Sequence, residues 1–203
     1  MRMRRLGLAA GAGVLGAAVW WRKNPSACPY SQRFWVEAPH PFITRARLRE
    51  ALEPRPGERV LEVGPGTGYY SLPVADWVAP DGRLDVVDIQ QEMLDHTTRR
   101  AREAGIGNIV PARADARELP YEDGAFDAAY LVTVLGEVPD QDAALRELRR
   151  VLKHDGRLVV GELFGDPHMV TARTLERRAR AAGLSVERRL GGLLWHFSRL
   201  APA

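Results

Sequence analysis

Apolar residues alternate along the chain between short continuous runs and runs with helical spacing. The continuous runs predict strands at 59–63, 84–88, 109–112, 126–132, 157–163, 184–190 and 193–200. The helical spacing predicts helices near 42–52, 68–78, 91–104, 141–152 and 171–182. Strands that alternate with helices predict an α/β fold around a mostly parallel sheet. Gly191-Gly192 is a hairpin signal, so we expect the last two strands to be antiparallel.

A glycine-rich turn follows the first predicted strand, in the sequence Val60-Leu61-Glu62-Val63-Gly64-Pro65-Gly66-Thr67-Gly68. Glycine allows a tight turn and a close approach of the backbone to a ligand. The second strand ends in Asp88, 20 residues after Gly68. A carboxylate at that place can accept both hydroxyls of a ribose. The two features together predict a nucleoside-binding site.

The details of the turn discriminate between nucleoside cofactors. A dinucleotide fingerprint G-x-G-x-x-G would need glycine where this chain has Tyr69, which disfavours a nicotinamide dehydrogenase. The turn is instead preceded by Glu62, and a carboxylate there suits a cationic ligand better than a pyrophosphate. S-adenosylmethionine (SAM) carries an ammonium group and a sulfonium. At this point the chain resembles the class I SAM-dependent methyltransferases, whose first motif is similar to residues 62–68.

Further segments match this family in the same order, and the resemblance covers roughly residues 45–200. It implies a Rossmann-like seven-stranded sheet, flanked by helices, whose last strand is antiparallel. It also implies that Asp88 holds the ribose, that Ile89 packs on adenine and that Asp115 meets the adenine amino group. The cofactor-binding residues implied are Glu62, Gly64, Gly66, Gly68, Asp88, Ile89, Asp115, Ala116 and Thr133.

Composition limits the possible function classes. A chain of 203 residues has room for one domain with a proper core. Its single cysteine, Cys28, excludes an internal disulfide and a cysteine zinc cluster, and we expect no metal site. The net charge is +3, but residues 1–50 carry +7, which leaves −4 for the remainder. A mildly acidic catalytic domain argues against nucleic acid as a partner.

Residues 6–21 form an uncharged run between two basic clusters. As a helix the run would span about 24 Å at ~1.5 Å per residue, against ~30 Å for a bilayer core. We predict a membrane anchor that spans or partly inserts, at residues 1–23. A secretory signal peptide, a lipoprotein through Cys28 and an ordinary amphipathic or disordered tail are the alternatives. The expected location is the cytoplasmic face of a membrane, with a linker or cap at 24–44 and the methyltransferase domain at 45–203.

The linker is rich in proline and aromatic residues. Many small-molecule methyltransferases close an N-terminal segment over the cofactor, and Phe34 and Trp35 are candidates for that role. The alternative is that both side chains pack on the domain surface or lie at the membrane interface.

Methyl transfer from a sulfonium mainly requires alignment of the nucleophile and exclusion of water. The Asn/Asp-Pro-Pro-aromatic loop of enzymes that methylate amino groups of nucleic acids is missing after the fourth strand. Glu137 lies there and is a candidate to orient the acceptor. His168, in the loop after the fifth strand, is a candidate general base. For each of the two residues, an ordinary surface or capping role is the alternative.

These observations predict methyl transfer from SAM to a small acceptor that is apolar or amphipathic, such as a quinone precursor or a lipid. The alternatives are a soluble-metabolite methyltransferase that is merely tethered to the membrane, and a SAM-binding protein without catalysis. The sequence makes no prediction of the oligomeric state or of the acceptor atom.

Overall fold

The computed structural model describes residues 25–32 and 41–203. The predicted anchor at 1–23 and the candidate cap residues Phe34 and Trp35 lie outside these ranges. The chain forms a mixed seven-stranded sheet in the order β3-β2-β1-β4-β5-β7-β6, with β7 antiparallel to both of its neighbours. The strands are β1 (Arg59–Val63), β2 (Arg83–Asp88), β3 (Ile109–Arg113), β4 (Phe126–Val132), β5 (Leu152–Leu163), β6 (Leu184–Gly191) and β7 (Trp195–Pro202). The predicted fold class of the domain is confirmed.

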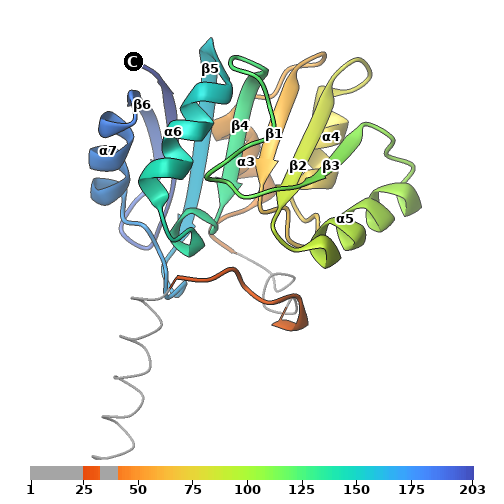
Figure 1. Ribbon diagram of the computed structural model, residues 1–203, viewed down its shortest axis with the longest axis horizontal. Helices are drawn as coiled ribbons and strands as arrows, with labels where there is room; N and C mark the ends of the chain where they lie inside the picture. The colour runs from red at the N-terminus through yellow and green to blue at the C-terminus, as the bar shows by residue number, and fades with distance from the viewer. Residues whose placement is uncertain (1–24, 33–40) are drawn as a thin grey trace, which may run out of the picture.

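Helices cover both faces of the sheet (Figure 1). The α-helices are α3 (Arg45–Leu52), α4 (Ser71–Val78), α5 (Gln91–Glu103), α6 (Gln141–Val151) and α7 (Ala172–Ala181), and η1 (Tyr30–Gln32) and η2 (Leu135–Glu137) are short 3-10 turns. One apolar cluster joins the sheet to α6 and α7, and a second joins its other face to α3, α4 and α5. Among the described residues, no helix has the length and apolar character needed to cross a bilayer.

Local capping explains where the helices begin. The side chains of Thr44, Asp140 and Thr171 accept hydrogen bonds from backbone N–H groups in the first turns of α3, α6 and α7. The first predicted helix therefore starts three residues later than expected. The helix predicted from residue 68 begins at Ser71, because Gly68 adopts a φ of 79° that no right-handed helix allows.

Two boundaries at the end of the sheet differ from the sequence prediction. Strand β5 starts at Leu152 rather than at residue 157, because Leu152 pairs with Phe126 ahead of a register shift. The β6–β7 connection is longer than the predicted two-residue turn, since Gly191 still pairs with His196 and residues 192–194 form the loop. The prediction placed Leu193 and Leu194 in a strand, whereas the structure exposes both of them at the tip of the hairpin.

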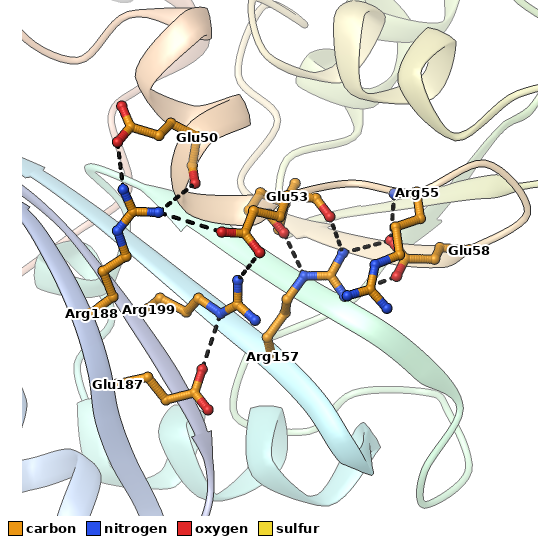
Figure 2. Close-up of polar contacts among 9 residues, drawn as sticks. Glu50, Glu53, Arg55, Glu58, Arg157, Glu187, Arg188 and Arg199 are labelled. Carbon is orange, nitrogen blue, oxygen red and sulfur yellow. Dashed lines mark hydrogen bonds and ion pairs between the residues drawn. The ribbon is translucent and has the colours of Figure 1, made fainter.

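Arg157 on β5 fixes α3 against the sheet (Figure 2). Its side chain is buried and donates hydrogen bonds to the backbone carbonyls of Leu52 and Glu53 at the end of α3. It also forms an ion pair with Glu58 at 2.5 Å. A cation at a helix C-terminus satisfies free carbonyls and opposes the helix dipole. Arg199 extends the network from β7 through its ion pair with Glu53 at 2.7 Å.

The strand order reverses between β1 and β4, which are adjacent in the sheet while β2 and β3 lie on the far side of β1. In open α/β sheets, the ligand crevice lies outside the carboxyl ends of the strands at such a switch point. The glycine-rich turn leaves β1 at this place. The topology therefore brings the predicted cofactor residues to one edge of the sheet.

Candidate cofactor and acceptor site

A cavity of about 380 Å³ opens at the carboxyl ends of β1, β2 and β4. This volume is within the range of small-molecule sites. The lining comprises Pro25, Ser26, Ala27, Cys28, Val63, Gly64, Gly66, Val87, Asp88, Ile89, Gln90, Met93, Ala114, Asp115, Ala116, Arg117, Val132, Thr133, Val134, Glu137, Val138 and Pro139. Most of the cofactor residues predicted from the sequence are thus brought together in one cavity.

The glycine turn forms one wall of the cavity. Gly64 adopts a φ of 71° and donates its N–H to the carbonyl of Val87 at 2.8 Å. A Cβ added to Gly64 would lie 2.5 Å from Cγ2 of Val134, so only glycine fits between these loops. Gly68 does not line the cavity. A Cβ there would lie 2.9 Å from Leu72, which gives Gly68 a packing role at the start of α4.

Asp88 lies at the end of β2, beside the cavity and next to the half-exposed side chain of Ile89. One of its carboxylate oxygens accepts the backbone N–H of Gln90 at 2.9 Å. Burial raises the pKa of Asp88, and the hydrogen bonds from the backbone of Gln90 and Ile89 oppose this rise. An acid fixed beside an exposed apolar side chain suits a ribose next to an adenine ring.

Asp115 follows β3, the strand beside β2, lines the same cavity and is already paired. Arg117 binds its carboxylate with a shortest contact of 2.7 Å and also donates its backbone N–H at 2.9 Å. The hydrogen bonds from this guanidinium hold the pKa of Asp115 below its usual range. Ala116, which follows, is buried in the lining. An adenine amino group would therefore share Asp115 with Arg117.

Glu62 lies behind the glycine turn and is not part of the cavity lining. Its side chain is 2% exposed. Burial raises the pKa of Glu62 to about 7, and the neighbouring hydroxyls of Ser71 and Tyr130 act in the opposite direction. The structure thus places Glu62 beneath the turn, from where a direct contact with the cofactor would need a shift of the turn.

Thr133 follows β4 and lines the cavity with an unusual backbone conformation. Its φ is 55°, in the left-handed region that non-glycine residues seldom occupy. The backbone N–H of Thr133 donates to the carbonyl of Gly161 at 2.8 Å, and the Thr133 hydroxyl donates to the carbonyl of Val132 at 2.7 Å. Such a conformation costs about 1–3 kcal/mol and is typical of functional sites.

Glu137, in η2, is mostly buried in the wall of the cavity. Burial raises its pKa to about 8, with smaller contributions from the charges of Asp166 and Asp88. One carboxylate oxygen accepts the backbone N–H of Cys28 at 3.2 Å, and this bond acts against the rise. Glu137 is thus a carboxyl group that changes charge close to neutral pH inside the cavity.

Residues 25–32, which we name the N-terminal strap, run below the carboxyl edge of the sheet (Figure 1), and residues 25–28 line the cavity. The side chain of Gln90 donates to the carbonyl of Cys28 at 2.9 Å and accepts the backbone N–H of Tyr30 at 3.1 Å. The hydroxyl of Tyr30 lies 3.3 Å from Nδ1 of His96 on α5. The sequence predicted a linker or cap at 24–44, which includes the strap, with Phe34 and Trp35 as candidates that lie outside the described residues, and it did not single out Gln90.

His168 lies outside this cavity, in a neighbouring pocket of about 200 Å³. The two pockets share Pro25. They also adjoin at η2, where Gly136 lines the pocket of His168 and the next residue, Glu137, lines the larger cavity. The backbone N–H of His168 donates to a carboxylate oxygen of Asp166 at 2.7 Å. The structure therefore separates the two candidate catalytic residues, with Glu137 beside the cofactor cavity and His168 in the adjoining pocket. The catalytic roles of both residues stay predictions.

The described residues hold no group of three or more His, Cys, Asp or Glu side chains that could bind a metal ion. They do hold a cavity lined by Asp88, by the exposed apolar side chain of Ile89 and by further acids. The fold and this site define a class I SAM-dependent methyltransferase domain.

More particularly, the chain belongs to the ubiE/COQ5 methyltransferase family, whose model matches residues 40–174. The resemblance inferred from the sequence is confirmed, and SAM is the cofactor of this class.

Individual relatives support this assignment. The chain is 40% identical over 114 residues to the ubiquinone/menaquinone biosynthesis C-methyltransferase UbiE of Vibrio cholerae, a match that covers 56% of this chain and 44% of that protein. The UbiE of Cellvibrio japonicus is 41% identical over 120 residues, or 59% of this chain and 48% of that protein. The matches thus span less than half the length of these relatives.

Solved structures show the same fold. A SAM-dependent methyltransferase from Aquifex aeolicus superposes with a TM-score of 0.79 at 18% identity, covering 87% of this chain and all of that one. The [4+2]-cyclase SpnF gives a TM-score of 0.66 at 30% identity, covering 72% of this chain and 57% of that one. SpnF is named for a cyclisation, so this fold is not restricted to methyl transfer.

Proposed function

We propose that this protein transfers a methyl group from SAM to a ring carbon of a quinone precursor. The observation that carries the proposal is the extent of the family match, since residues 40–174 include the glycine turn, Asp88, Asp115, Glu137 and His168. The relatives named UbiE are C-methyltransferases of quinone biosynthesis. An electron-rich ring carbon is a sufficient nucleophile for this chemistry without a metal or a covalent enzyme intermediate.

The reaction balances in one displacement and one proton loss. SAM supplies an electrophilic methyl group on its sulfonium. The ring carbon forms a bond to that methyl group with a ring electron pair, the methyl–sulfur bond breaks, and its electron pair stays on sulfur. The ring then loses the proton from the methylated carbon and regains its aromaticity. In its ionised form, the Glu137 carboxylate takes this proton, and a pKa near the operating pH is suited to such a role.

The acceptor ring would approach through the pocket beside the cofactor cavity. That pocket adjoins Glu137 through Gly136 and is lined by His168, Met169 and Val170. Its volume of about 200 Å³ is suited to one substituted ring. In this arrangement His168 contacts the acceptor, and the long apolar tail of a quinone precursor would remain outside the pocket.

The predicted location is consistent with such an acceptor. Prenylated quinone precursors are confined to membranes, and the uncharged run at 6–21 between basic clusters is suited to membrane association. We therefore propose a position at the cytoplasmic face of a membrane, where SAM is available from the cytosol. Sedimentation of the full-length protein with membranes at physiological salt would test the location independently of the activity.

The decisive experiment is incubation with labelled SAM and a membrane extract, followed by mass spectrometry of lipids and quinones. We expect the label on a ring carbon of a quinone precursor, and less label with the Asp88→Ala variant when SAM is limiting. Label on a water-soluble metabolite would identify a soluble-metabolite methyltransferase instead. SAM binding without any methyl transfer would place the chain with the proteins that use this fold for other purposes, as SpnF does.

A further inference from the structure

Exposed large apolar side chains gather at one edge of the domain. Phe42, Phe164, Leu193 and Leu194 are 42%, 68%, 94% and 54% exposed, and they are four of the six large hydrophobic residues exposed in the described part of the chain. They come from three separate segments, namely the entry to α3, the loop after β5 and the β6–β7 hairpin tip. We name this set the apolar rim.

Direct contacts join the three segments of the apolar rim. The backbone N–H of Phe164 donates to the carbonyl of Leu194 at 2.7 Å. The guanidinium of Arg47 donates to the carbonyl of Phe42 at 2.5 Å and lies 4.2 Å from the ring centroid of Trp195, next to Leu194. The three segments of the rim therefore lie side by side, unlike scattered exposed residues, which would need no explanation.

The rim lies at the edge of the sheet where the site opens. Strand β5 ends at Leu163 and β7 begins at Trp195, so both loops lie at the carboxyl edge. Figure 1 shows the β5–α7 loop and the start of the N-terminal strap together at the lower end of the domain. Pro25, the first residue of the strap, lines the pocket of His168 and Met169. The chain that precedes Pro25, with its uncharged run at 6–21, thus joins the domain at this same edge.

The charges at this edge favour an anionic partner. Arg45 and Arg47 lie at the start of α3, and Arg173 is exposed in the first turn of α7. The nearby acids are less accessible, since Glu162 at the end of β5 is buried and Asp166 in the β5–α7 loop is half-buried. Apolar side chains bordered by arginines are typical of proteins that lie on anionic lipid.

We infer that the apolar rim docks on the surface of an anionic bilayer, with Leu193 and Leu194 entering the headgroup region. This inference rests on the proposed function and extends it, because the acceptor pocket then faces the lipid from which the acceptor comes. An anchor alone would hold the domain near a membrane in any orientation. The rim gives the domain a defined orientation with the carboxyl edge toward the bilayer.

The test measures orientation with the full-length chain. Cys28→Ser removes the native thiol, and a polarity-sensitive fluorophore is then attached to Leu193→Cys, or to Asp155→Cys as the control. Asp155 is 75% exposed in its side chain and lies near the start of β5, at the opposite edge of the sheet. Vesicles of equal parts phosphatidylethanolamine and phosphatidylglycerol carry nitroxide labels in their headgroups. SAM binding by each labelled protein confirms that its fold is intact.

We expect the fluorophore at 193 to shift to the blue and to be quenched by the vesicles, while the fluorophore at 155 is unaffected. A second variant, Leu193→Ser/Leu194→Ser, should raise KM severalfold for an acceptor embedded in vesicles and leave KM unchanged for a tailless, water-soluble analogue. Equal signals at 193 and 155, or no binding to the vesicles, would overturn the docking proposal. Turnover of the soluble analogue is measured separately, so a failure of the methyltransferase proposal is distinguished from a failure of docking.

Discussion

Gln90→Ala should weaken SAM binding by releasing the N-terminal strap from the wall of the cavity. The side chain of Gln90 makes two hydrogen bonds to the strap backbone, at 2.9 Å to Cys28 and at 3.1 Å to Tyr30. Each such bond contributes about 0.5–1.5 kcal/mol net, so strap docking should lose about 1–3 kcal/mol. If bound SAM depends fully on the closed strap, its Kd rises by about 5–150-fold, since ~1.4 kcal/mol is a factor of ten.

Isothermal titration calorimetry of SAM against both proteins measures this change. Gln91→Ala is the matched control one residue away, because the Gln91 side chain bonds only to Asp95 on its own helix among the contacts seen here. The thermal midpoint should change little in either variant, since both positions lie outside the two apolar clusters. An unchanged Kd for Gln90→Ala would refute the closure of the strap over the cofactor. An equal loss in Gln91→Ala would point to damage to the start of α5 instead.

Three further changes test individual side chains of the site. Asp88→Ala should weaken the free energy of SAM binding by about 1–3 kcal/mol, the cost of leaving polar groups unpaired. The control is Asp95→Ala on the exposed face of α5, whose Kd for SAM by calorimetry should match that of the wild type. Folded Glu137 has a pKa of about 8 against an ordinary 4.5, so the native state keeps a proton that the unfolded chain releases, and wild-type stability should fall as pH rises from about 4.5 to about 8. Glu137→Gln should lose that component of the pH dependence. Thermal melts of both proteins between about pH 4.5 and about pH 8 measure it, and an equal dependence of the melting temperature on pH in the two proteins would contradict the prediction. His168→Ala should lower kcat on a carbon acceptor far less than the ~10²–10⁴-fold typical of removing a general base; steady-state rates with a loss in that range would show that His168 is the base.

The cofactor half of the site could be predicted because its signals are local. The turn is encoded by the positive φ angles of Gly64 and Gly66 and by the close packing at Gly64, and these properties favour glycine at fixed spacing. Asp88 follows from the end of a strand that apolar periodicity already reveals. The element boundaries that the sequence did not predict are those set by pairing with distant strands, such as the early start of β5 at Leu152.

The strap could not be located from the sequence, because the contacts that hold it are distant along the chain. Gln90 is separated from Cys28 by 62 positions, and Glu137 is separated from it by 109. No periodicity marks an irregular segment that docks through its backbone carbonyl and N–H groups. Proline and aromatic enrichment did indicate a cap, but it did not indicate which residues touch the cavity.

A cationic ligand would stabilise the ionised forms of the acids that line the site. Burial raises the pKa values of Asp88 and Glu137, which means that the ionised forms lack full compensation from the protein itself. Arg117, which lines the cavity, is already paired with Asp115. A sulfonium adds a positive charge beside these acids, whereas the demethylated product keeps its ammonium group but has a neutral thioether in place of the sulfonium. The cavity should therefore favour SAM over its product in the ionised state of Glu137. The loss of the methyl group then weakens the very interaction that held the cofactor, which favours product release after transfer.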